Sequence, residues 1–365
     1  MHIGIMDFGI HAIQLEIKTS WKIIKKFLGK NMTNNLGKSK IVILGSTGFV
    51  GTWLSLYFEK KNYNYLGIGL KENKNKFHNK IKNNINYKYL DIQNFKNLSI
   101  ILDKYKPDLI INLAANSLVS DCNDFPYNSL KNNCISALNI MEYVRLNKNI
   151  KLINFTSDKV YQSRNKKHTE SSNYGSNTIY GSSKVFSDLV ASNYISLYGC
   201  KIINLRCGNL YGGGDFNPNR FFNDVFFSYH NNQNLMIRSI HSSRPWTYIL
   251  ELLNFMTILS NLFLGNKLNI EFSGVNFSSN YKNYNIGDLL EILKKKIDIK
   301  WESQKNLISE DKFLDINSSY IRKMINYNNV FNFNDTLIQM IDWYSEYYND
   351  KHILSKSYEQ LDKIQ

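Results

Sequence analysis

The sequence predicts an α/β fold in which helices cover both faces of a doubly wound parallel sheet. Three observations support this fold class. Short apolar runs alternate with helix-length segments, a glycine-rich turn follows the first run, and a hydroxyl-bearing stretch follows a later one. The chain has 365 residues, which is long enough to bury a full core. We therefore expect one large sheet with ligands bound beyond the carboxyl ends of its strands.

The strands are predicted from apolar runs separated by segments with the length and polar-apolar pattern of helices. The runs are Ile41–Leu44, Tyr65–Gly69, Tyr87–Leu90, Leu109–Asn112, Leu152–Phe155 and Ile202–Arg206. From about Gly212 the alternation gives way to loops that contain Gly, Asn and Ser. We expect residues 39–211 to form the sheet domain, and residues 212–365 to form mainly a smaller lobe that is interleaved with it.

Residues 1–38 are predicted to be an N-terminal extension outside this fold. Asp7, His11 and Glu16 interrupt any apolar stretch of the kind found in signal peptides, and Met32 is a candidate start of the native protein. An alternative is that the extension forms an amphipathic helix that packs or docks elsewhere.

The glycine-rich turn runs from Gly45 to Gly51, between the first strand and a helix that starts near Thr52. Glycines at such a turn allow backbone N–H groups to approach a pyrophosphate, whose charge the helix N-terminus then favours. A tight turn without a ligand fits these residues equally well. The turn therefore predicts a phosphate site only in combination with other motifs.

Tyr180 and Lys184 supply such a motif. They stand four residues apart within a predicted helix, roughly Thr178 to Tyr198, so their side chains share one face. A nearby ammonium favours phenolate over phenol and lowers a tyrosine pKa from about 10 toward the range of a general base. The alternative is a buried aromatic ring beside a solvated lysine.

A third motif, Thr156-Ser157-Asp158-Lys159, follows the apolar run that ends at Phe155. It places a hydroxyl, a carboxylate and an amine at the end of a parallel strand, where open α/β sheets bind ligands. In this order and spacing, the three motifs resemble the extended short-chain dehydrogenase/reductase superfamily. The resemblance implies a Rossmann-type NAD-binding domain over residues 39–211 and a substrate-binding lobe mainly over residues 212–365.

Further segments resemble CDP-glucose 4,6-dehydratases within that superfamily, from about residue 38 to the end of the chain. The segments are Arg206-Cys207-Gly208-Asn209, Tyr211-Gly212-Gly213-Gly214-Asp215-Phe216, Arg244-Pro245-Trp246, Phe313-Leu314-Asp315, Trp343-Tyr344 and Tyr358-Glu359-Gln360-Leu361. The resemblance implies oxidation of a nucleotide sugar at C4, elimination of water across C5–C6, and hydride return to C6. It also implies that Asn209, Arg220 and Arg244 bind the substrate.

The resemblance assigns a role to each candidate catalytic residue. Tyr180 would take the proton of the 4-hydroxyl, Lys184 would hold the tyrosine pKa down, and Ser157 would hydrogen-bond the 4-oxygen. Asp158 would protonate the departing 6-hydroxyl, and Lys159 would be the base at C5. A lysine that acts as a base must be neutral, which requires a site that lowers its pKa from about 10.4. Phosphate binding is the alternative for Lys159, and a cap on the strand end is an alternative for both residues.

The resemblance also implies positions around NAD. Those at the pyrophosphate are Gly45, Thr47, Gly48, Phe49, Val50 and Gly51; those at the adenine are Asp91 and Ile92; those on the nicotinamide side are Leu113, Ala114 and Ala115, ordered by Asn133, with Tyr180 and Lys184. Lys71 follows the second strand, where an acidic residue normally reads the ribose 2′-hydroxyl, and it would tolerate the 2′-phosphate of NADP. NAD is preferred because a dehydratase recycles its hydride.

Three departures from the family leave the nucleotide open. The segment between Tyr161 and Tyr180 is short, Ser120 and Asp121 stand where arginines are usual, and Ser157 replaces a threonine while keeping the hydroxyl. A sugar-nucleotide 4-epimerase or 4-ketoreductase would use the same Ser157, Tyr180 and Lys184 without elimination. A non-enzymatic nucleotide sensor is a further alternative, although sensors of this fold commonly lose the tyrosine or the lysine.

Composition narrows the choice of partners and compartment. The net charge is +15, but the lysines are dispersed among asparagines, and this dispersion argues against nucleic-acid binding. The positive charge still attracts an anionic nucleotide.

The four cysteines, Cys122, Cys134, Cys200 and Cys207, lack the spacing of a zinc site. They predict reduced thiols, a cytoplasmic location and no metal. The longest apolar stretch, Tyr248 to Leu264, contains polar residues and predicts an amphipathic helix rather than a membrane span. We expect a homodimer or a higher homo-oligomer.

Overall fold

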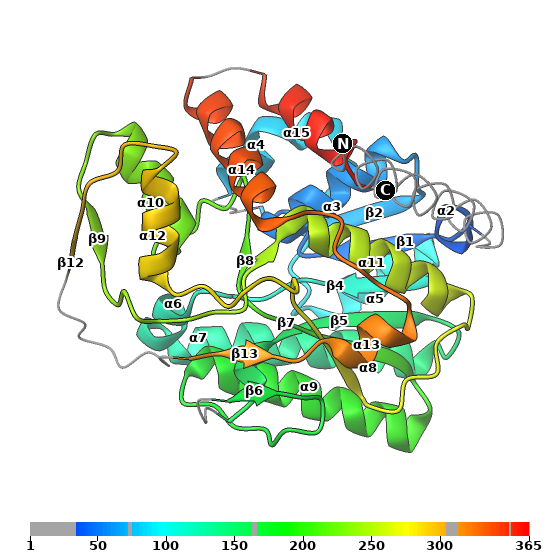
Figure 1. Ribbon diagram of the computed structural model, residues 1–365. Coiled ribbons are helices and arrows are strands. Elements are labelled where there is room, and N and C mark those ends of the chain that lie inside the picture. The colour runs from blue at the N-terminus through cyan, green and yellow to red at the C-terminus, as the bar shows by residue number, and fades with distance from the viewer. Residues whose placement is uncertain (1–33, 72–74, 163–165, 304–312, 350–351, 365) are drawn as a thin grey trace, which may run out of the picture. The chain divides into compact units, whose positions relative to one another are not determined.

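The computed structural model describes residues 34–71, 75–162, 166–303, 313–349 and 352–364 (Figure 1). Most of the predicted N-terminal extension therefore lies outside the described residues. Backbone contacts separate residues 1–35 from residues 36–365, and the account below concerns the second of these units. The predicted boundary at residue 211 stays a prediction.

In the described residues, seven parallel strands form one sheet in the order β11-β7-β5-β4-β1-β2-β3. Their bounds are β1 Ile41–Leu44, β2 Tyr65–Gly69, β3 Tyr87–Tyr89, β4 Leu109–Asn112, β5 Lys151–Ser157, β7 Lys201–Cys207 and β11 Gly274–Phe277. Strand order reverses between β1 and β4, the arrangement of a doubly wound Rossmann-type sheet. The predicted fold class is confirmed.

Alternation along the strands divides the core between the two faces of the sheet. Ile41 and Ile43 of β1 join one buried cluster, whereas Val42 and Leu44 join another. Successive side chains of a strand point to opposite faces, and this sheet is apolar on both, so helices must cover both faces. α3 (Phe49–Lys60) and α11 (Ile249–Leu264) pack in the first cluster, and α5 (Phe95–Tyr105), α8 (Ser136–Leu146) and α9 (Ile179–Tyr198) in the second (Figure 1).

The apolar stretch predicted as an amphipathic helix is α11, and three of the polar residues that interrupt it, Glu251, Asn254 and Ser260, are buried. The Glu251 carboxylate accepts hydrogen bonds from the Tyr327 hydroxyl at 2.6 Å and from the backbone N–H groups of Val330 and Phe331. Glu251 therefore anchors the loop before α14 to the sheet domain. No helix in the described ranges is long and apolar enough to span a membrane.

The seventh strand, β11, was not predicted from the sequence. Its four residues, Gly-Val-Asn-Phe, lie among Ser and Asn residues and read as part of a loop. In the structure β11 pairs in parallel with β7, so a segment beyond Gly212 completes the edge of the sheet. β5 and β7 also run further than predicted, to Ser157 and Cys207.

The remaining elements are short strands and further helices. The two-stranded pairs are β6 Lys167–His168 with β13 Asp315–Ile316, β8 Leu210–Tyr211 with β10 Thr247–Tyr248, and β9 Leu235–Ile237 with β12 Trp301–Ser303. The helices are α2 Asn35–Lys38, α4 Lys76–Ile81, η1 Lys82–Asn84, α6 Val119–Asp124, α7 Pro126–Leu130, η2 Lys131–Ile135, η3 Asp158–Val160, α10 Phe221–His230, α12 Ile286–Lys294, α13 Ser319–Met324, α14 Phe333–Tyr348 and α15 Ile353–Leu361.

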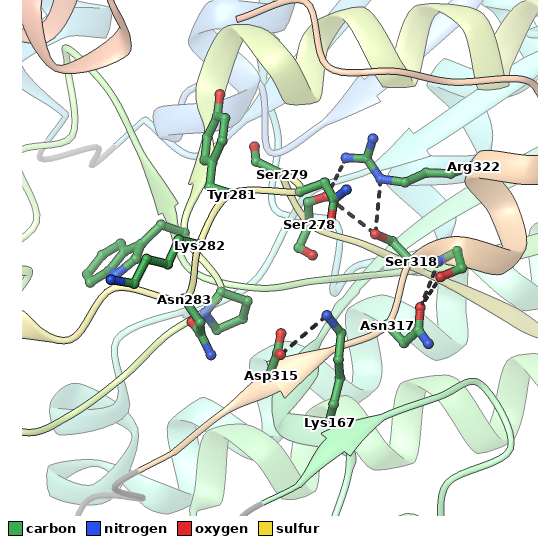
Figure 2. Close-up of a pocket in the computed structure, with 14 residues that line it drawn as sticks. Lys167, Ser278, Ser279, Tyr281, Lys282, Asn283, Asp315, Asn317, Ser318 and Arg322 are labelled. Carbon is green, nitrogen blue, oxygen red and sulfur yellow. Dashed lines mark hydrogen bonds and ion pairs between the residues drawn. The ribbon is translucent and has the colours of Figure 1, made fainter. Parts of the chain in front are cut away.

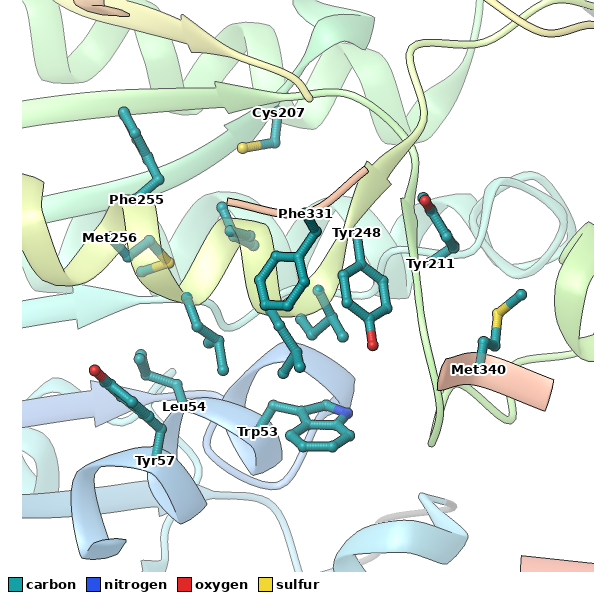
Figure 3. Packing of buried hydrophobic residues seen from close by; sticks show 14 of the residues in the cluster. Trp53, Leu54, Tyr57, Cys207, Tyr211, Tyr248, Phe255, Met256, Phe331 and Met340 are labelled. Carbon is teal, nitrogen blue, oxygen red and sulfur yellow. The ribbon is translucent and has the colours of Figure 1, made fainter. Parts of the chain in front are cut away.

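An aromatic cluster fixes the glycine run that follows β8. Trp53 of α3 donates its indole N–H to the Gly213 carbonyl at 2.7 Å, and a Cβ on Gly213 would stand 2.3 Å from the Trp343 ring. Figure 3 shows Trp53 in this core with Tyr211, Tyr248 and residues of α11. The glycine run and Trp343, far apart in sequence, therefore form one packing unit.

Candidate active site

A cavity of about 830 Å³ lies at the carboxyl ends of the strands and contains most of the predicted site. Its lining includes Gly45, Gly48, Phe49, Val50, Gly51, Leu113, Ala115, Ser157, Asp158, Lys159, Tyr180, Lys184, Asn209, Arg220 and Arg244. The three motifs of the sequence are thus brought to one site. Its volume lies within the range of small-molecule and cofactor sites.

The glycine-rich turn is shaped by close backbone contacts. Gly45 has a φ of +80°, and a Cβ there would lie 2.7 Å from the backbone nitrogen of Ala114. A Cβ on Gly51 would lie 2.2 Å from the Gly45 carbonyl oxygen, whereas one on Gly48 would meet only that oxygen, at 3.4 Å. The turn is therefore packed against the protein at Gly45 and Gly51 and open at Gly48, which lines the cavity at the N-terminus of α3. This geometry fits a pyrophosphate held by backbone N–H groups.

We expect Gly51→Ala to destabilise the turn and abolish NAD binding, because the added methyl group overlaps a backbone oxygen that cannot rotate away. Gly48→Ala is the matched control for the melting temperature, since its methyl group has room in the protein. Thermal unfolding and calorimetric titration with NAD check both variants. A Gly51→Ala protein with unchanged melting temperature and normal NAD affinity would contradict this account of the turn.

Ser157 and Asp158 lie where β5 passes into η3. The Ser157 hydroxyl donates to Asp158 Oδ1 at 2.8 Å and accepts from the Lys159 backbone nitrogen at 3.2 Å. Asp158 is only 3 % exposed, and in the described part of the chain its Oδ2 has no hydrogen-bond partner. Burial raises the pKa of Asp158, and this effect outweighs the opposing charges of Lys159 and Arg244 and the Ser157 hydrogen bond. The carboxyl is thus biased toward its protonated form.

α9 positions Tyr180 and Lys184 against this strand end. Thr178 caps the helix by accepting from the Gly181 nitrogen at 3.0 Å, and a Cβ on Gly181 would lie 2.9 Å from the Lys159 carbonyl oxygen. The glycine therefore allows the first turn of α9 to approach η3 closely. Lys184 is buried and its Nζ lies 5.9 Å from the centre of the Tyr180 ring. The predicted helix and its shared face are confirmed.

Burial is the strongest influence on the Tyr180 phenol in this structure, and the expected effect of Lys184 on its pKa stays a prediction. Burial raises the pKa of Tyr180 to about 12, against the lowering effects of the Ser157 hydrogen bond and the Arg220 charge. The Lys184 ammonium donates to the Phe155 carbonyl oxygen at 2.9 Å, and burial lowers its own pKa to about 8. The lysine points to the strand backbone rather than to the phenol, so Arg220 supplies the cation that opposes burial at Tyr180.

Asn133 orders the loop after β4, as the resemblance implied. Its Oδ1 accepts from the Asn116 nitrogen at 2.7 Å, and its Nδ2 donates to the Asn116 carbonyl at 3.0 Å and to the Ser183 hydroxyl at 2.9 Å. Asn116 and Ser183 were not predicted from the sequence. Ser183 lies next to Lys184 on α9, so Asn133 joins the loop after β4 directly to that helix.

Some predicted cofactor positions lie outside the cavity lining, namely Thr47, Asp91, Ile92, Ala114 and Asn133. Asp91 is exposed and accepts from the Gln93 nitrogen at 3.0 Å, whereas Ile92 is buried in the second core cluster. Both follow β3, at the same edge of the sheet as the glycine-rich turn. Their assignment to the adenine stays a prediction.

The predicted substrate residues come together through β8 and β10. The Asn209 carbonyl accepts from the Thr247 nitrogen at 2.8 Å, which places it beside the Arg244-Pro245-Trp246 segment. Arg244 is buried at the cavity wall and donates to the Ser243 carbonyl at 2.9 Å. Arg220, at the start of α10, lies 3.7 Å from the Asp215 carboxylate. Two guanidinium groups thus border the cavity.

A second hollow of about 170 Å³ lies beside the cavity and shares Trp246 with it (Figure 2). Its cations already contact the protein, since Lys167 lies 3.4 Å from Asp315 and Arg322 donates to the Ser278 carbonyl at 2.6 Å. None of the predicted site residues, all of which the structure describes, lines it. The larger cavity is therefore the candidate active site.

Comparison with known proteins identifies the family. The model of the NAD dependent epimerase/dehydratase family matches residues 41–270. The chain belongs to this family. NAD is the cofactor of the family, and the turn at Gly45, Gly48 and Gly51 has the close approach and the open helix N-terminus that a dinucleotide requires. Among the described residues no cluster of His, Cys, Asp and Glu is suited to a metal ion, and all four cysteines are free thiols.

Relatives within the family include dehydratases. The chain is 29% identical over 240 residues to CDP-glucose 4,6-dehydratase of Salmonella typhimurium, which covers 61% of this chain and 67% of the relative. It is 24% identical over 346 residues to Protein CapI of Staphylococcus aureus, with 85% and 99% covered. With the family model, these similarities show that the chain is an enzyme of the superfamily of NAD-dependent nucleotide-sugar dehydratases and epimerases.

Solved structures share the fold. The dTDP-glucose 4,6-dehydratase of Bacillus anthracis in complex with NAD superposes with a TM-score of 0.70 at 20% identity, covering 86% of this chain and 99% of that one. The UDP-glucuronic acid 4-epimerase of Bacillus cereus in complex with UDP-glucuronic acid and NAD gives 0.72 at 20% identity, covering 85% and 100%. Dehydratases and epimerases share this architecture, so the fold does not choose between them.

Proposed function

We propose that the protein is a nucleotide-sugar 4,6-dehydratase that converts CDP-glucose, or a related nucleoside diphosphate hexose, to the 4-keto-6-deoxy sugar. The observation that carries this proposal is the state of Asp158. Its carboxyl is buried in the cavity wall and has a raised pKa, one of its oxygens has no partner among the described residues, and it stands between Ser157 and Lys159. Epimerisation at C4 needs no such acid, whereas loss of water needs one.

Oxidation at C4 is assigned to Ser157, Tyr180 and Lys184. NAD, when bound, would accept the hydrogen of C4 with its electron pair and return it to C6. Tyr180 takes the proton of the 4-hydroxyl, and Ser157, whose hydroxyl opposes the rise in the tyrosine pKa, holds the 4-oxygen. Lys184, anchored to the Phe155 carbonyl, fixes the helix beside them.

Elimination is assigned to Asp158 and Lys159. A ketone at C4 acidifies the proton on C5, so one base and one acid suffice to remove water across C5–C6. Asp158 donates its proton to the 6-hydroxyl as it leaves, and its raised pKa keeps that proton available at higher pH. Lys159, half-buried at the same wall, takes the proton from C5.

Substrate recognition is assigned to Asn209, Arg220 and Arg244. Guanidinium groups pair well with phosphates, and the two arginines line the same cavity. The choice of cytidine rests on the similarity to the Salmonella typhimurium enzyme. The free thiols fit a reducing compartment, so we place the enzyme in the cytoplasm.

Mass spectrometry of the purified protein incubated with NAD and a panel of nucleoside diphosphate hexoses tests the proposal. A product lighter than its substrate by one water indicates dehydration. A product of unchanged mass with an inverted C4 indicates epimerisation instead, and a panel without any product contradicts both enzymatic assignments.

We also propose that the protein is a homodimer formed through the outer faces of α7, η2 and α9. These helices pack on one another and expose Tyr127, Ile135, Phe186 and Leu189. Exposed apolar side chains that gather into a patch mark interaction sites. We expect light scattering to give twice the mass of one chain for the unaltered protein. The Leu189→Asp variant should have the mass of a single chain. A monomeric unaltered protein would contradict the proposal.

A further inference from the structure

Consecutive residues of β5 are each hydrogen-bonded to α9. The Asn154 amide donates to the Ser187 hydroxyl at 3.0 Å, the Phe155 carbonyl accepts from Lys184 at 2.9 Å, and the Thr156 hydroxyl donates to Asp188 at 3.0 Å. The next residue of the strand is Ser157. These bonds therefore fix how far α9 can slide along β5, and with it the place of Tyr180 opposite Ser157.

Asp188 is the centre of this attachment. Besides Thr156, its carboxylate accepts from the Tyr174 hydroxyl at 2.9 Å, from Asn204 at 3.1 Å, and from Arg206 at 2.7 and 2.9 Å. Asp188 and Arg206 are 0% and 1% exposed. Tyr174 lies in the segment that leads into Tyr180, so Asp188 also holds the segment before α9.

A ladder of buried asparagines extends the attachment to the cofactor loop. Asn112, Asn154 and Asn204 occupy paired positions on β4, β5 and β7. Asn112 donates to Asn154 at 3.0 Å, and Asn154 donates to Asn204 at 2.8 Å. Asn112 also accepts from the Ala114 nitrogen at 3.1 Å. The ladder therefore joins the loop at Ala114 to Asp188 across the sheet.

We propose that Asp188 is a positioning residue for the reaction, and that with the asparagine ladder it sets the register of α9 on β5 so that Tyr180 faces Ser157. The proposal rests on the proposed function for its chemical readout. It differs from a purely structural role because it predicts loss of rate without loss of ligand affinity.

The expected size of the fall in kcat follows from helix geometry. Slipping α9 by one residue along β5 moves Tyr180 by about 1.5 Å. A displacement of about 1 Å at the reacting groups can cost on the order of 10²-fold in rate. Asp188→Asn should therefore lower kcat on the order of 10²-fold, with KM for the sugar nucleotide and affinity for NAD nearly unchanged.

Asp188→Asn leaves Arg206 buried without its counter-ion, so a second variant is needed in case the first does not fold. The double variant Thr156→Val, Ser187→Ala removes two of the bonds between β5 and α9 and keeps the Asp188–Arg206 ion pair. We expect it to lower kcat about tenfold. Glu251→Gln is the matched control, because it alters a buried, hydrogen-bonded carboxylate on α11, outside the cavity lining.

Two readouts are needed. One is the rate at which nicotinamide absorbance changes when a sugar nucleotide is added, because C4 oxidation is common to dehydratases and epimerases. The other is amide hydrogen exchange of the protein without substrate, followed in the peptide that covers residues 179–188. The proposal requires faster exchange there in the double variant than in Glu251→Gln at equal melting temperature, together with the fall in kcat.

Normal kcat in the double variant, or an equal fall in Glu251→Gln, would overturn the proposal. If the unaltered protein oxidises no sugar nucleotide, the proposed function fails, and hydrogen exchange alone decides on Asp188. If exchange at residues 179–188 is then equal in the double variant and in Glu251→Gln, the positioning role is overturned as well.

Discussion

Tyr180→Phe is expected to remove turnover while NAD stays bound. The phenyl ring keeps the packing of the tyrosine but cannot accept the proton of the 4-hydroxyl. Loss of a general base costs on the order of 10²–10⁴-fold in rate. The measurement is kcat on each accepted sugar nucleotide, together with calorimetric titration of NAD. Near-full activity on every substrate would remove Tyr180 from the chemistry.

Because the pKa of Tyr180 is raised, a variant at Arg220 can test which cation acts on this phenol. Arg220 opposes the effect of burial on this phenol, whereas Lys184 bonds to the strand backbone. In Arg220→Gln the pKa of Tyr180 should rise further, so the rising limb of the pH–rate profile should move to higher pH. Because a base must be deprotonated to act, a shift to lower pH would show that Arg220 does not serve this function.

Lys159→Ala is expected to separate oxidation from elimination. Ser157, Tyr180 and Lys184 remain, so C4 of the sugar is still oxidised and reduced nicotinamide accumulates when CDP-glucose is added. No 6-deoxy product should form, because breaking the C5–H bond needs a base placed over that carbon. Absorbance of the reduced cofactor and mass spectrometry of the sugar measure the two halves separately.

Lys159→Arg distinguishes a base from a phosphate ligand. Arginine keeps the positive charge and binds phosphate well, but it cannot become neutral in a protein. If Lys159 is the base, the arginine variant should stall as the alanine variant does. Restoration of the dehydrated product by arginine would leave phosphate binding as the role of this residue.

Sequence patterns predicted the parts of the molecule that depend on local periodicity. The runs at β1, β2 and β4 match the observed strands, and α9 begins and ends within a residue of its predicted limits. These elements are strongly apolar or are capped by recognisable residues, such as Thr178 at one end of α9 and Gly199 at the other. The motif residues were also expected at one edge of the sheet, because parallel strands end there.

Long-range contacts were not predictable in the same way. β11 lacks an apolar run because its asparagine is used inside the protein, where Asn276 accepts from the Tyr161 hydroxyl at 2.6 Å. The burial that raises the pKa of Tyr180 and the bond from Lys184 to the Phe155 carbonyl could not be predicted, because helical spacing places Lys184 on the correct face but does not say where its ammonium points. Asp188 carried a usable signal, a carboxylate four residues after Lys184 on the same helix face, but its partner Arg206 is on another strand.

The attachment of α9 to β5 also determines which insertions and deletions leave the site intact. A residue inserted between Tyr180 and Asp188 would rotate everything beyond it by about 100°. Those hydrogen bonds of Asn154, Phe155 and Thr156 whose partners lie beyond the insertion would then be lost together. Substitutions that spare the site residues and these hydrogen bonds can be accepted there, but insertions and deletions cannot. We therefore expect descendants of this protein to vary in length outside this stretch, and the spacing from Tyr180 to Asp188 to stay fixed even where the residues between them change.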